Sequence, residues 1–239
     1  MKHAVARSED HDRHIAEMFD RVAPRYDALN RVLSIGRDVG WRRRAAAVAR
    51  MGPREIALDV GVGTGDLAFG LLDASDPSVR IVGVDLSPLM VDAVRRRAAA
   101  RLDPRLAPLL ASAAALPFAD ASFDRVVAGF TVRNFGDLAV GLREMRRVLR
   151  AGGRAAILEF STPPNALIGI GYRLYLHQLV PRIAALLGGD AAAYRYLPRS
   201  VAAFPDADGL AELMRDAGFA RVRYERRTFG VAAIHVGEA

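Results

Sequence analysis

Three glycines at alternate positions, Gly61, Gly63 and Gly65, carry the clearest chemical signal in the chain. The apolar run before them predicts a short buried strand at residues 56–60, and the apolar residues 67–72 predict the start of a helix. Glycine allows positive φ and lets the backbone approach a ligand without a Cβ in the way. Because open α/β sheets bind ligands where a strand gives way to a helix, we expect a ligand at this turn.

The spacing of the glycines does not fit two common phosphate-binding motifs. A dinucleotide fingerprint needs its third glycine three positions after the second, where this chain has Asp66, and no Gly-Lys-Ser/Thr follows as in a P-loop. A second predicted strand, residues 79–85, ends in Asp85, whose ionised carboxylate can accept two hydrogen bonds from a ribose diol. This combination favours a nucleoside without a pyrophosphate, such as S-adenosylmethionine, over a plain tight loop.

Strand-like and helix-like segments alternate along most of the chain. This alternation predicts one large α/β domain with a doubly wound, mostly parallel sheet. The last two strands are joined by a short turn at residues 228–230 and predict a closing hairpin, so one edge of the seven-stranded sheet should be antiparallel. The predicted strands are residues 56–60, 79–85, 106–110, 123–130, 154–160, 219–227 and 229–236.

Residues 1–53 are expected to form a helical cap over one end of the sheet. The polar residues 1–13 should be loosely ordered, and Pro24 should divide the following helical pattern into two short helices. Asp38 is expected to be the N-cap of the next helix. The cap either simply packs on the sheet or closes over a ligand, with Tyr26 or Trp41 lining the site.

Residues 163–198 interrupt the alternation with an apolar helical insertion that carries scattered arginines. One interpretation is ordinary packing onto the sheet. The other is an apolar wall for a hydrophobic substrate, or a face that contacts lipid. Arg173 and Arg182 would supply positive charge for such a contact.

Composition narrows the class of protein. The chain has 239 residues, no cysteine and a net charge of +7 that is almost all arginine. A GC-rich coding sequence explains most of this charge, and the run Arg42-Arg43-Arg44 is expected on a solvated helix face. The absence of cysteine excludes thiolate chemistry, and no metal site and no nucleic-acid-binding motif are predicted. Without a signal sequence or a membrane-length apolar run, we expect a cytoplasmic protein, and a peripheral place at the inner face of the membrane stays open.

Several motifs resemble the C-methyltransferases of ubiquinone and menaquinone biosynthesis, the UbiE/MenG family, over nearly the whole chain. The most specific are the Phe-Asp-x-Val-Ala-x-x-Tyr-Asp pattern, the Arg-Asn pair and the C-terminal tail. The matching stretches are residues 18–23 with Tyr26-Asp27 and Asn30, 59–66, 116–118, Arg133-Asn134, 147–149 with 152–154, 158–161, Tyr196-Leu197 with Ser200, Phe204-Pro205 and 228–237.

The resemblance implies a class I S-adenosylmethionine-dependent methyltransferase, with a Rossmann-like domain at residues 54–239. It implies that Thr64 and the three glycines face the methionine part of the cofactor, that Asp85 holds the ribose, and that Ser112-Ala113 meet the adenine edge. Gly129 would line the cofactor site at the end of the fourth strand. Ser112 and Gly129 depart from the family's usual Asn or Asp and Ser at these positions.

The family reaction moves a methyl group from a sulfonium to a ring carbon of a prenylated quinol. Such a carbon becomes nucleophilic when a ring hydroxyl loses its proton. Arg133 is the best candidate for stabilising the resulting oxyanion, and a pair with Asp137 or Glu144 is its structural alternative. Guanidinium stays protonated, so the base would be a water held by Arg133 and Asn134, or a carboxylate or His177 from the cap.

Three functions therefore compete at the level of sequence. The first is methylation of a quinol ring, with demethylmenaquinol favoured by the short chain and its arginine usage and a ubiquinone precursor as the alternative. The second is a secondary-metabolite methyltransferase on the same scaffold, and the third is a cofactor-binding protein without catalysis. A homodimer stays open, and the partner that the resemblance implies is the prenylated quinol.

Overall fold

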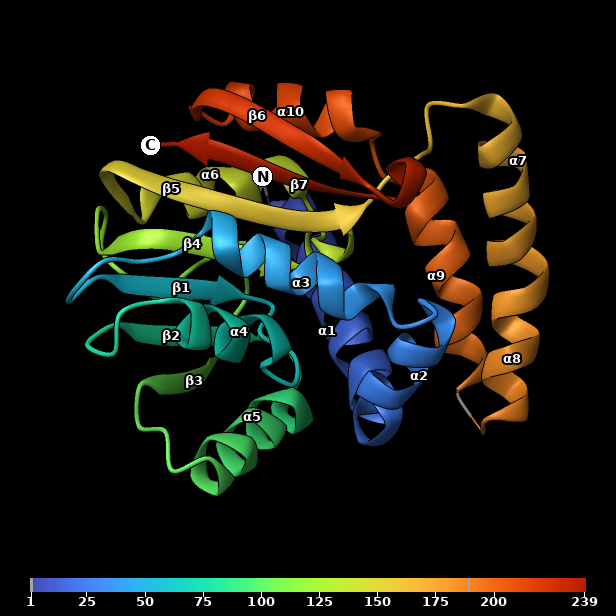
Figure 1. The fold of residues 1–239 in the computed structure, drawn as a ribbon, viewed down its shortest axis with the longest axis horizontal. Helices are drawn as coiled ribbons and strands as arrows, with labels where there is room; N and C mark the ends of the chain where they lie inside the picture. The colour runs from blue at the N-terminus through green and yellow to red at the C-terminus, as the bar shows by residue number, and fades with distance from the viewer. Residues whose placement is uncertain (1, 189) are drawn as a thin grey trace.

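The computed structural model describes residues 2–188 and 190–239, and its centre is a twisted sheet (Figure 1). Within this part of the chain the sheet has seven strands in the order β3-β2-β1-β4-β5-β7-β6. The predicted α/β fold is confirmed, since β1, β2, β3, β4 and β5 pair in parallel. The strands are β1 (Ile56–Val60), β2 (Arg80–Asp85), β3 (Leu106–Leu110), β4 (Phe123–Gly129), β5 (Leu149–Phe160), β6 (Ala220–Arg227) and β7 (Ala232–Glu238).

The C-terminal hairpin is also present, with a short turn, η4 (Thr228–Gly230), between β6 and β7. The strand that runs against the others is β7, and it lies one place in from the edge because it inserts between β5 and β6. The antiparallel pairing at this edge is therefore as predicted. The outermost strand, β6, runs in the same direction as β1 to β5.

Helices cover both faces of the sheet and bury alternate strand residues. On β1, Ala57 belongs to the core under one layer of helices and Leu58 to the core under the other, and both are fully buried. The first layer contains α3 (Arg37–Val48), α4 (Asp66–Ala74) and α5 (Pro88–Ala100), and the second contains α6 (Leu138–Arg147) and α10 (Ala207–Asp216).

Local capping sets the start of several of these helices. Ser87 accepts a hydrogen bond from the Met90 amide at the start of α5, and Asp137 accepts one from Val140 at the start of α6. The expectation for Asp38 is wrong, because the N-cap of α3 is Gly36 with φ +70, two residues earlier. Asp38 is instead buried in the first turn of α3.

The N-terminal residues form α1 (Lys2–Val22), a 3-10 turn η1 (Ala23–Arg25) and α2 (Tyr26–Leu33). The break at Pro24 is as predicted. The loose segment predicted for residues 1–13 is wrong for residues 2–13, which are helical, while Met1 lies outside the described residues. His11 and Asp12 reach the strand ends, where the ring of His11 meets the Asn134 carbonyl and Asp12 binds Ser112. Polar side chains therefore hold this helix in place, which its composition does not reveal.

The insertion forms α7 (Ala166–Leu174), a π-helical turn η3 (Tyr175–Leu179), α8 (Val180–Leu186) and α9 (Ala191–Ala203). These helices stand beside α1 and α2 beyond the ends of the parallel strands (Figure 1). They share a core with the cap rather than with the middle of the sheet. Its buried members are Val22, Leu29, Leu33, Leu176, Val180, Ala184, Tyr194 and Val201.

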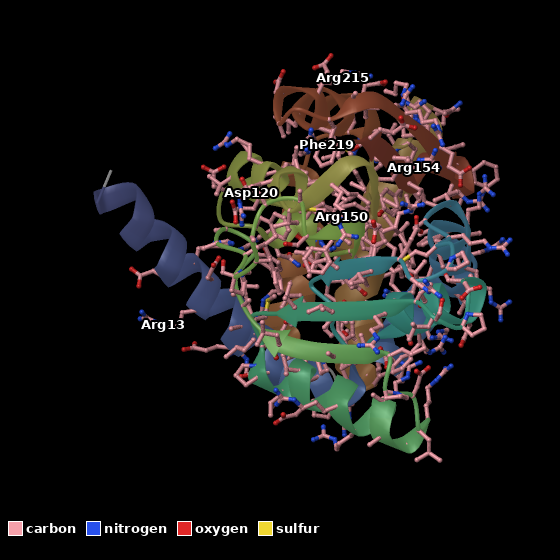
Figure 2. All side chains as sticks on the ribbon, turned by 90° about the vertical axis from the view of Figure 1, so that its left-hand side faces the viewer. Arg13, Asp120, Arg150, Arg154, Arg215 and Phe219 are labelled. Atoms are coloured by element: carbon pink, nitrogen blue, oxygen red, sulfur yellow. The ribbon has the colours of Figure 1, made fainter. Side chains whose placement is uncertain are left out.

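The two ends of the sheet differ in character. The amino ends of the parallel strands face the viewer in Figure 2, which labels Arg150 and Arg154 there. Arg150 pairs with Asp124 at 2.7 Å and Arg154 with Glu238 at 3.5 Å, and both arginines are exposed. The carboxyl ends lie under the cap and the insertion, and they hold the cavities described below. None of the helices in the described residues is both long and apolar enough to cross a membrane.

Candidate active site

Two cavities lie side by side at the carboxyl ends of the strands. We call the first the strand-end cleft; it is lined by the ends of β1, β2 and β4, by the segment after β3, and by side chains of α1. We call the second the cap cavity; it lies among α2, α3, α7, η3 and the ends of β4 and β5. Tyr26 and Phe130 line both, so these two rings form the wall that the cavities share.

The glycine turn brings bare backbone into the strand-end cleft. Gly61 has φ +71, and a Cβ there would lie 2.0 Å from Thr131 Oγ1, so no other residue fits without a rearrangement. Gly63 has φ +54 with open space around it, and both glycines line the cleft. Gly65 is needed for another reason: it has φ +88 at the start of α4, and a Cβ would meet the ring of Phe69 at 2.9 Å.

Asp85 is held in place by backbone donors. Its Oδ2 accepts a hydrogen bond from the Gly63 amide at 2.8 Å, and its Oδ1 accepts one from the Ser87 amide at 3.0 Å. Burial raises the pKa of Asp85, and these amide hydrogen bonds counteract the rise by stabilising the ionised form. Each oxygen keeps a further lone pair, so the carboxylate can still accept hydrogen bonds from a diol in the cleft.

Asp59 is a buried carboxylate directly before the turn. It is 1% exposed, and neither oxygen has a hydrogen-bond partner of normal geometry in the described part of the chain. Burial raises the pKa of Asp59 to about 7; the nearby charge of Arg42 lowers it in part and that of Asp85 raises it further. A cation bound next to the turn would supply a positive charge beside this carboxylate and would favour its ionised form.

Three carboxylates of the cap accept hydrogen bonds from hydroxyls around the cleft. Ser112 donates to Asp12 at 2.6 Å, Thr64 donates to Asp27 at 2.6 Å, and Ser87 donates to Asp20. Ser112 and Ala113 line the cleft, as does Gly129, whereas Thr64 is not among the lining residues and its hydroxyl is turned to the cap. The acids come from distant helices, so only the folded chain pairs them with these hydroxyls.

Arg133 and Asn134 are adjacent in the 3-10 turn η2 (Val132–Asn134) yet serve different cavities. Arg133 lines the cap cavity, and Asn134 lines the strand-end cleft and accepts a hydrogen bond from the Tyr196 hydroxyl at 3.2 Å. Arg133 forms a buried ion pair of 2.8 Å with Glu159 on β5. The structural alternative, a pair with Asp137 or Glu144, is wrong in its partner, since the parallel register places the end of β5 beside η2, whereas Asp137 caps α6 and Glu144 lies on that helix.

The cap cavity is larger and mostly apolar, with a volume of about 320 Å³. One wall is aromatic: Trp41 packs at 6.4 Å from Phe160, which lies 4.6 Å from Phe130 between ring centroids. Tyr26 or Trp41 was expected to line the site: Tyr26 lines both cavities, whereas Trp41 lines the cap cavity and not the strand-end cleft. The remaining lining is Asn30, Leu33, Ser34, Ile35, Arg37, Asp38, Arg42, Arg133, Tyr172, Tyr175, Leu176, Val180, Leu197, Thr228 and Val231.

Several polar atoms in the cap cavity lack partners. The Tyr172 hydroxyl and the Arg42 Nε are buried without a hydrogen bond in the described residues. Arg42 was expected in solvent, but its guanidinium lies over the Phe130 ring at 5.1 Å, because α3 turns this side of the helix inward. His177, a candidate base from the sequence, is exposed and does not line either cavity.

The strand-end cleft fits a cationic nucleoside in its chemistry. Gly61 supplies bare backbone and Asp85 supplies an oriented acceptor, while the buried carboxyl of Asp59 lies just before the turn, where a bound cation would favour its ionised form. The free volume of the cleft is only about 50 Å³, since Ile15 and Phe19 of α1 lie on it.

The sheet order, the glycine turn and the acidic tip of β2 define the fold class of S-adenosylmethionine-dependent methyltransferases. The chain matches the ubiE/COQ5 methyltransferase family over residues 7–239 and belongs to that family. The resemblance seen in the motifs is thus confirmed.

Relatives and solved structures agree with this assignment. The chain is 48% identical over 235 residues to the demethylmenaquinone methyltransferase of Deinococcus radiodurans, covering 98% of this chain and 96% of the relative. It is 43% identical over 229 residues to the ubiquinone/menaquinone biosynthesis C-methyltransferase UbiE of Geotalea uraniireducens, covering 94% and 95%. In fold it is similar to a Thermotoga maritima S-adenosylmethionine-dependent methyltransferase, a possible histamine N-methyltransferase, with a TM-score of 0.67, 22% identity and coverage of 94% and 99%.

Proposed function

We propose that the chain transfers a methyl group from S-adenosylmethionine to a ring carbon of a prenylated quinol, with demethylmenaquinol as the preferred acceptor. The observation that carries this proposal is the pairing of cavities: an apolar cavity shares the wall of Tyr26 and Phe130 with the cleft. The names of the two relatives support it, one pointing to menaquinone and the other to both quinones.

In this proposal each cavity has its own task. The cofactor, when bound, supplies an electrophilic methyl group on sulfur. Gly61, Gly63 and Asp85 position it, and the aromatic wall of the cap cavity places a flat ring on the other side of Tyr26 and Phe130. Arg133 stabilises negative charge on a ring oxygen, and Glu159 holds its guanidinium in place.

The direct test is a methyl-transfer assay with purified protein, S-adenosylmethionine and chemically reduced demethylmenaquinone, with the product measured by mass spectrometry. We expect a product that is heavier by one methylene. A monocyclic ubiquinone precursor, run in parallel, separates the two quinone acceptors, and a set of water-soluble phenols tests a role in secondary metabolism. Turnover of the phenols alone would overturn the proposal.

The exposed apolar side chains near the cap cavity also support contact with a lipid surface. Ile35 lines the cavity and is 80% exposed, while Leu167 and Leu186 on α7 and α8 are 80% and 87% exposed. Arg173 and Arg182 are exposed on the same helices. A prenyl tail could remain in the bilayer while the ring enters the cavity, because apolar side chains and basic charge together favour anionic membranes.

Liposome flotation tests this contact. We expect binding to vesicles with anionic lipid and its loss in a Leu167→Ser/Leu186→Ser variant. Leu102→Ser is the matched control, because Leu102 is 89% exposed but lies between α5 and the start of β3, away from the carboxyl ends of the strands. No flotation of the unaltered protein, or equal loss in the control, would argue against the contact.

A further inference from the structure

Asp38 and Arg42 leave a gap in the wall of the cap cavity. They lie one turn apart on α3, and Asp38 Oδ2 is 3.9 Å from Arg42 Nε, beyond hydrogen-bond distance. Asp38 Oδ1 accepts a hydrogen bond from the Ser34 hydroxyl at 2.7 Å, but Oδ2 accepts none from the described residues. Arg42 Nε is likewise without an acceptor in this part of the chain. The buried Arg42 Nε thus faces a carboxylate oxygen with which it makes no hydrogen bond, while Oδ1 of the same carboxylate lies 3.5 Å from Arg31 Nε.

We propose that this gap binds a ring hydroxyl of the methyl acceptor and that Asp38 is the base that removes its proton. A hydroxyl can donate to Asp38 Oδ2 and accept from the Arg42 guanidinium at the same time. The inference rests on the proposed function, since it takes a quinol as the occupant of the cap cavity.

The gap lies beside the wall that the two cavities share. The Arg42 guanidinium covers the Phe130 ring at 5.1 Å, and its Nη1 lies 3.5 Å from the position that a Cβ on Gly129 would take. Gly129 and Phe130 both line the strand-end cleft. A hydroxyl between Asp38 and Arg42 therefore holds the neighbouring ring carbon close to the junction, where the methyl group must cross.

The proposed step begins with transfer of a proton from the ring hydroxyl to Asp38. As Asp38 Oδ2 takes the hydroxyl proton, the O–H electron pair moves toward the ring, and the adjacent carbon forms the new bond to the methyl carbon. The pair of the broken S–C bond stays on sulfur. The methylated carbon then releases its hydrogen as a proton to water, and Asp38 returns the first proton to the ring oxygen. Arg42 stabilises the negative charge on that oxygen before the carbon–carbon bond forms, and again after the ring carbon has released its proton.

Other groups around the cavity fit the role of base less well. Arg133 is a guanidinium already paired with Glu159, and burial raises the pKa of Tyr172, so its hydroxyl stays neutral. Asp38 is the carboxylate among the described residues that line the cavity. The charged and titratable groups that face it or share its cavity are Tyr26, Arg31, Arg37, Arg42, Arg133, Tyr172 and Tyr175.

Asp38→Asn is the primary test, because it keeps the shape and the acceptor for Ser34 but removes the base. We expect turnover with demethylmenaquinol near pH 7 to fall about 100-fold or more, as for loss of a general base. Calorimetry should show cofactor affinity within about twofold of the unaltered protein. Asp103→Asn is the matched control: Asp103 is partly buried, pairs with Arg105 at 2.7 Å, and lies in the loop before β3, at the opposite end of the sheet.

Three further readouts separate a base from a structural role. The turnover of Asp38→Asn should rise toward that of the unaltered protein at alkaline pH, where the quinol ionises unaided. Formate should restore turnover to Asp38→Ala and leave the turnover of Asp103→Ala unchanged. The absorbance of bound α-naphthol, which has one ring hydroxyl, should show ionisation at a lower pH in Asp38→Asn, because Arg42 then faces the hydroxyl alone.

The outcomes are distinct. Failure of the unaltered protein to methylate any quinol would overturn the proposed function. Methylation by the unaltered protein together with near-normal turnover of Asp38→Asn would overturn the role of Asp38 alone. If Asp38→Asn does not fold, formate rescue of Asp38→Ala or the naphthol titration decides. Bound naphthol should then ionise at a higher pH in Arg42→Met than in the unaltered protein or in Asp103→Asn, and no change in Arg42→Met would count against the site.

Discussion

The strand-end cleft and the cap cavity are built in different ways. The cleft is made largely from backbone and short side chains at the ends of neighbouring strands, with Gly61, Gly63 and Asp85 within 25 residues of one another in the sequence. The cap cavity collects larger side chains from α2, α3, α7, η3 and η4, and Trp41 donates a hydrogen bond to Thr228 across its rim at 3.0 Å. The first therefore depends on sheet topology, and the second depends on how the cap and the insertion pack.

This difference predicts that the two cavities can be damaged separately. Changes in the cleft should alter cofactor affinity before acceptor affinity, and changes in the cap cavity should do the reverse.

Gly61→Ala should have the largest effect. A Cβ would lie 2.0 Å from Thr131 Oγ1 at φ +71, so both a clash and left-handed strain disfavour the turn. We expect cofactor affinity to fall about 100-fold or more, together with a loss of roughly 2–5 kcal/mol in the free energy of unfolding. Calorimetry and denaturant titration measure the two quantities.

Gly63→Ala is the matched variant for this clash. Gly63 has φ +54 but nothing within 4 Å of the added Cβ, so only the left-handed strain of about 1–2 kcal/mol remains. Equal damage from both variants would show that the contact with Thr131 is unimportant.

Arg133→Ala tests the cap-cavity side. Turnover should fall about 100-fold while cofactor affinity is retained, because Arg133 does not line the cleft. The free energy of unfolding should fall by about 3–5 kcal/mol, since Glu159 is left buried without its partner. The double variant Arg133→Ala/Glu159→Ala should recover stability but not turnover. A parallel loss of turnover and cofactor affinity would indicate a purely structural residue.

Asp59 should make cofactor binding depend on pH. Its folded-state pKa of about 7 lies above that of an ordinary aspartate, so the folded protein holds this proton more tightly than the unfolded chain. The free energy of unfolding should therefore fall as pH rises from about 4 through 7, and Asp59→Asn should remove this slope. Because a cationic cofactor favours the ionised carboxylate, its affinity should rise severalfold between about pH 6 and pH 8. A flat affinity profile would show that Asp59 does not sense the cofactor.

Tyr175→Phe should have the smallest effect and only on the acceptor side. The Tyr175 hydroxyl donates a hydrogen bond to the Leu33 carbonyl at 2.6 Å, joining the insertion to α2 at the cap cavity. Its loss should cost about 1 kcal/mol in stability and raise the acceptor KM roughly threefold, with cofactor affinity unchanged. Steady-state kinetics with both substrates measures the acceptor KM and the cofactor KM. A change in cofactor affinity instead would contradict the independence of the two cavities.

The sequence determined the framework and much of the cleft. Strand and helix periodicity predicted the parallel sheet with its C-terminal hairpin, because these patterns follow from which side chains must be buried on each element. Gly61, Gly63, Asp85, Ser112 and Gly129 could be placed at one edge, since parallel strands bring their carboxyl ends together whatever lies above them. Gly65 was expected at the cofactor but does not line the cleft. Its position requires glycine because a Cβ there would contact the ring of Phe69.

Only the tertiary structure decided the cap cavity and the contacts of the cap with the strand-end cleft. The pairing of Arg133 with Glu159, the hydroxyl contacts of Asp12 and Asp27, and the inward turn of Arg42 each join residues far apart in the chain. Local sequence patterns do not predict such contacts. They depend on how the helices of the cap pack against the sheet, and not on the pattern of residues within a single helix. Asp38 shows the difference most clearly: its sequence context indicated a helix cap, and its burial against Arg42 and Ser34 makes it a group that can do chemistry.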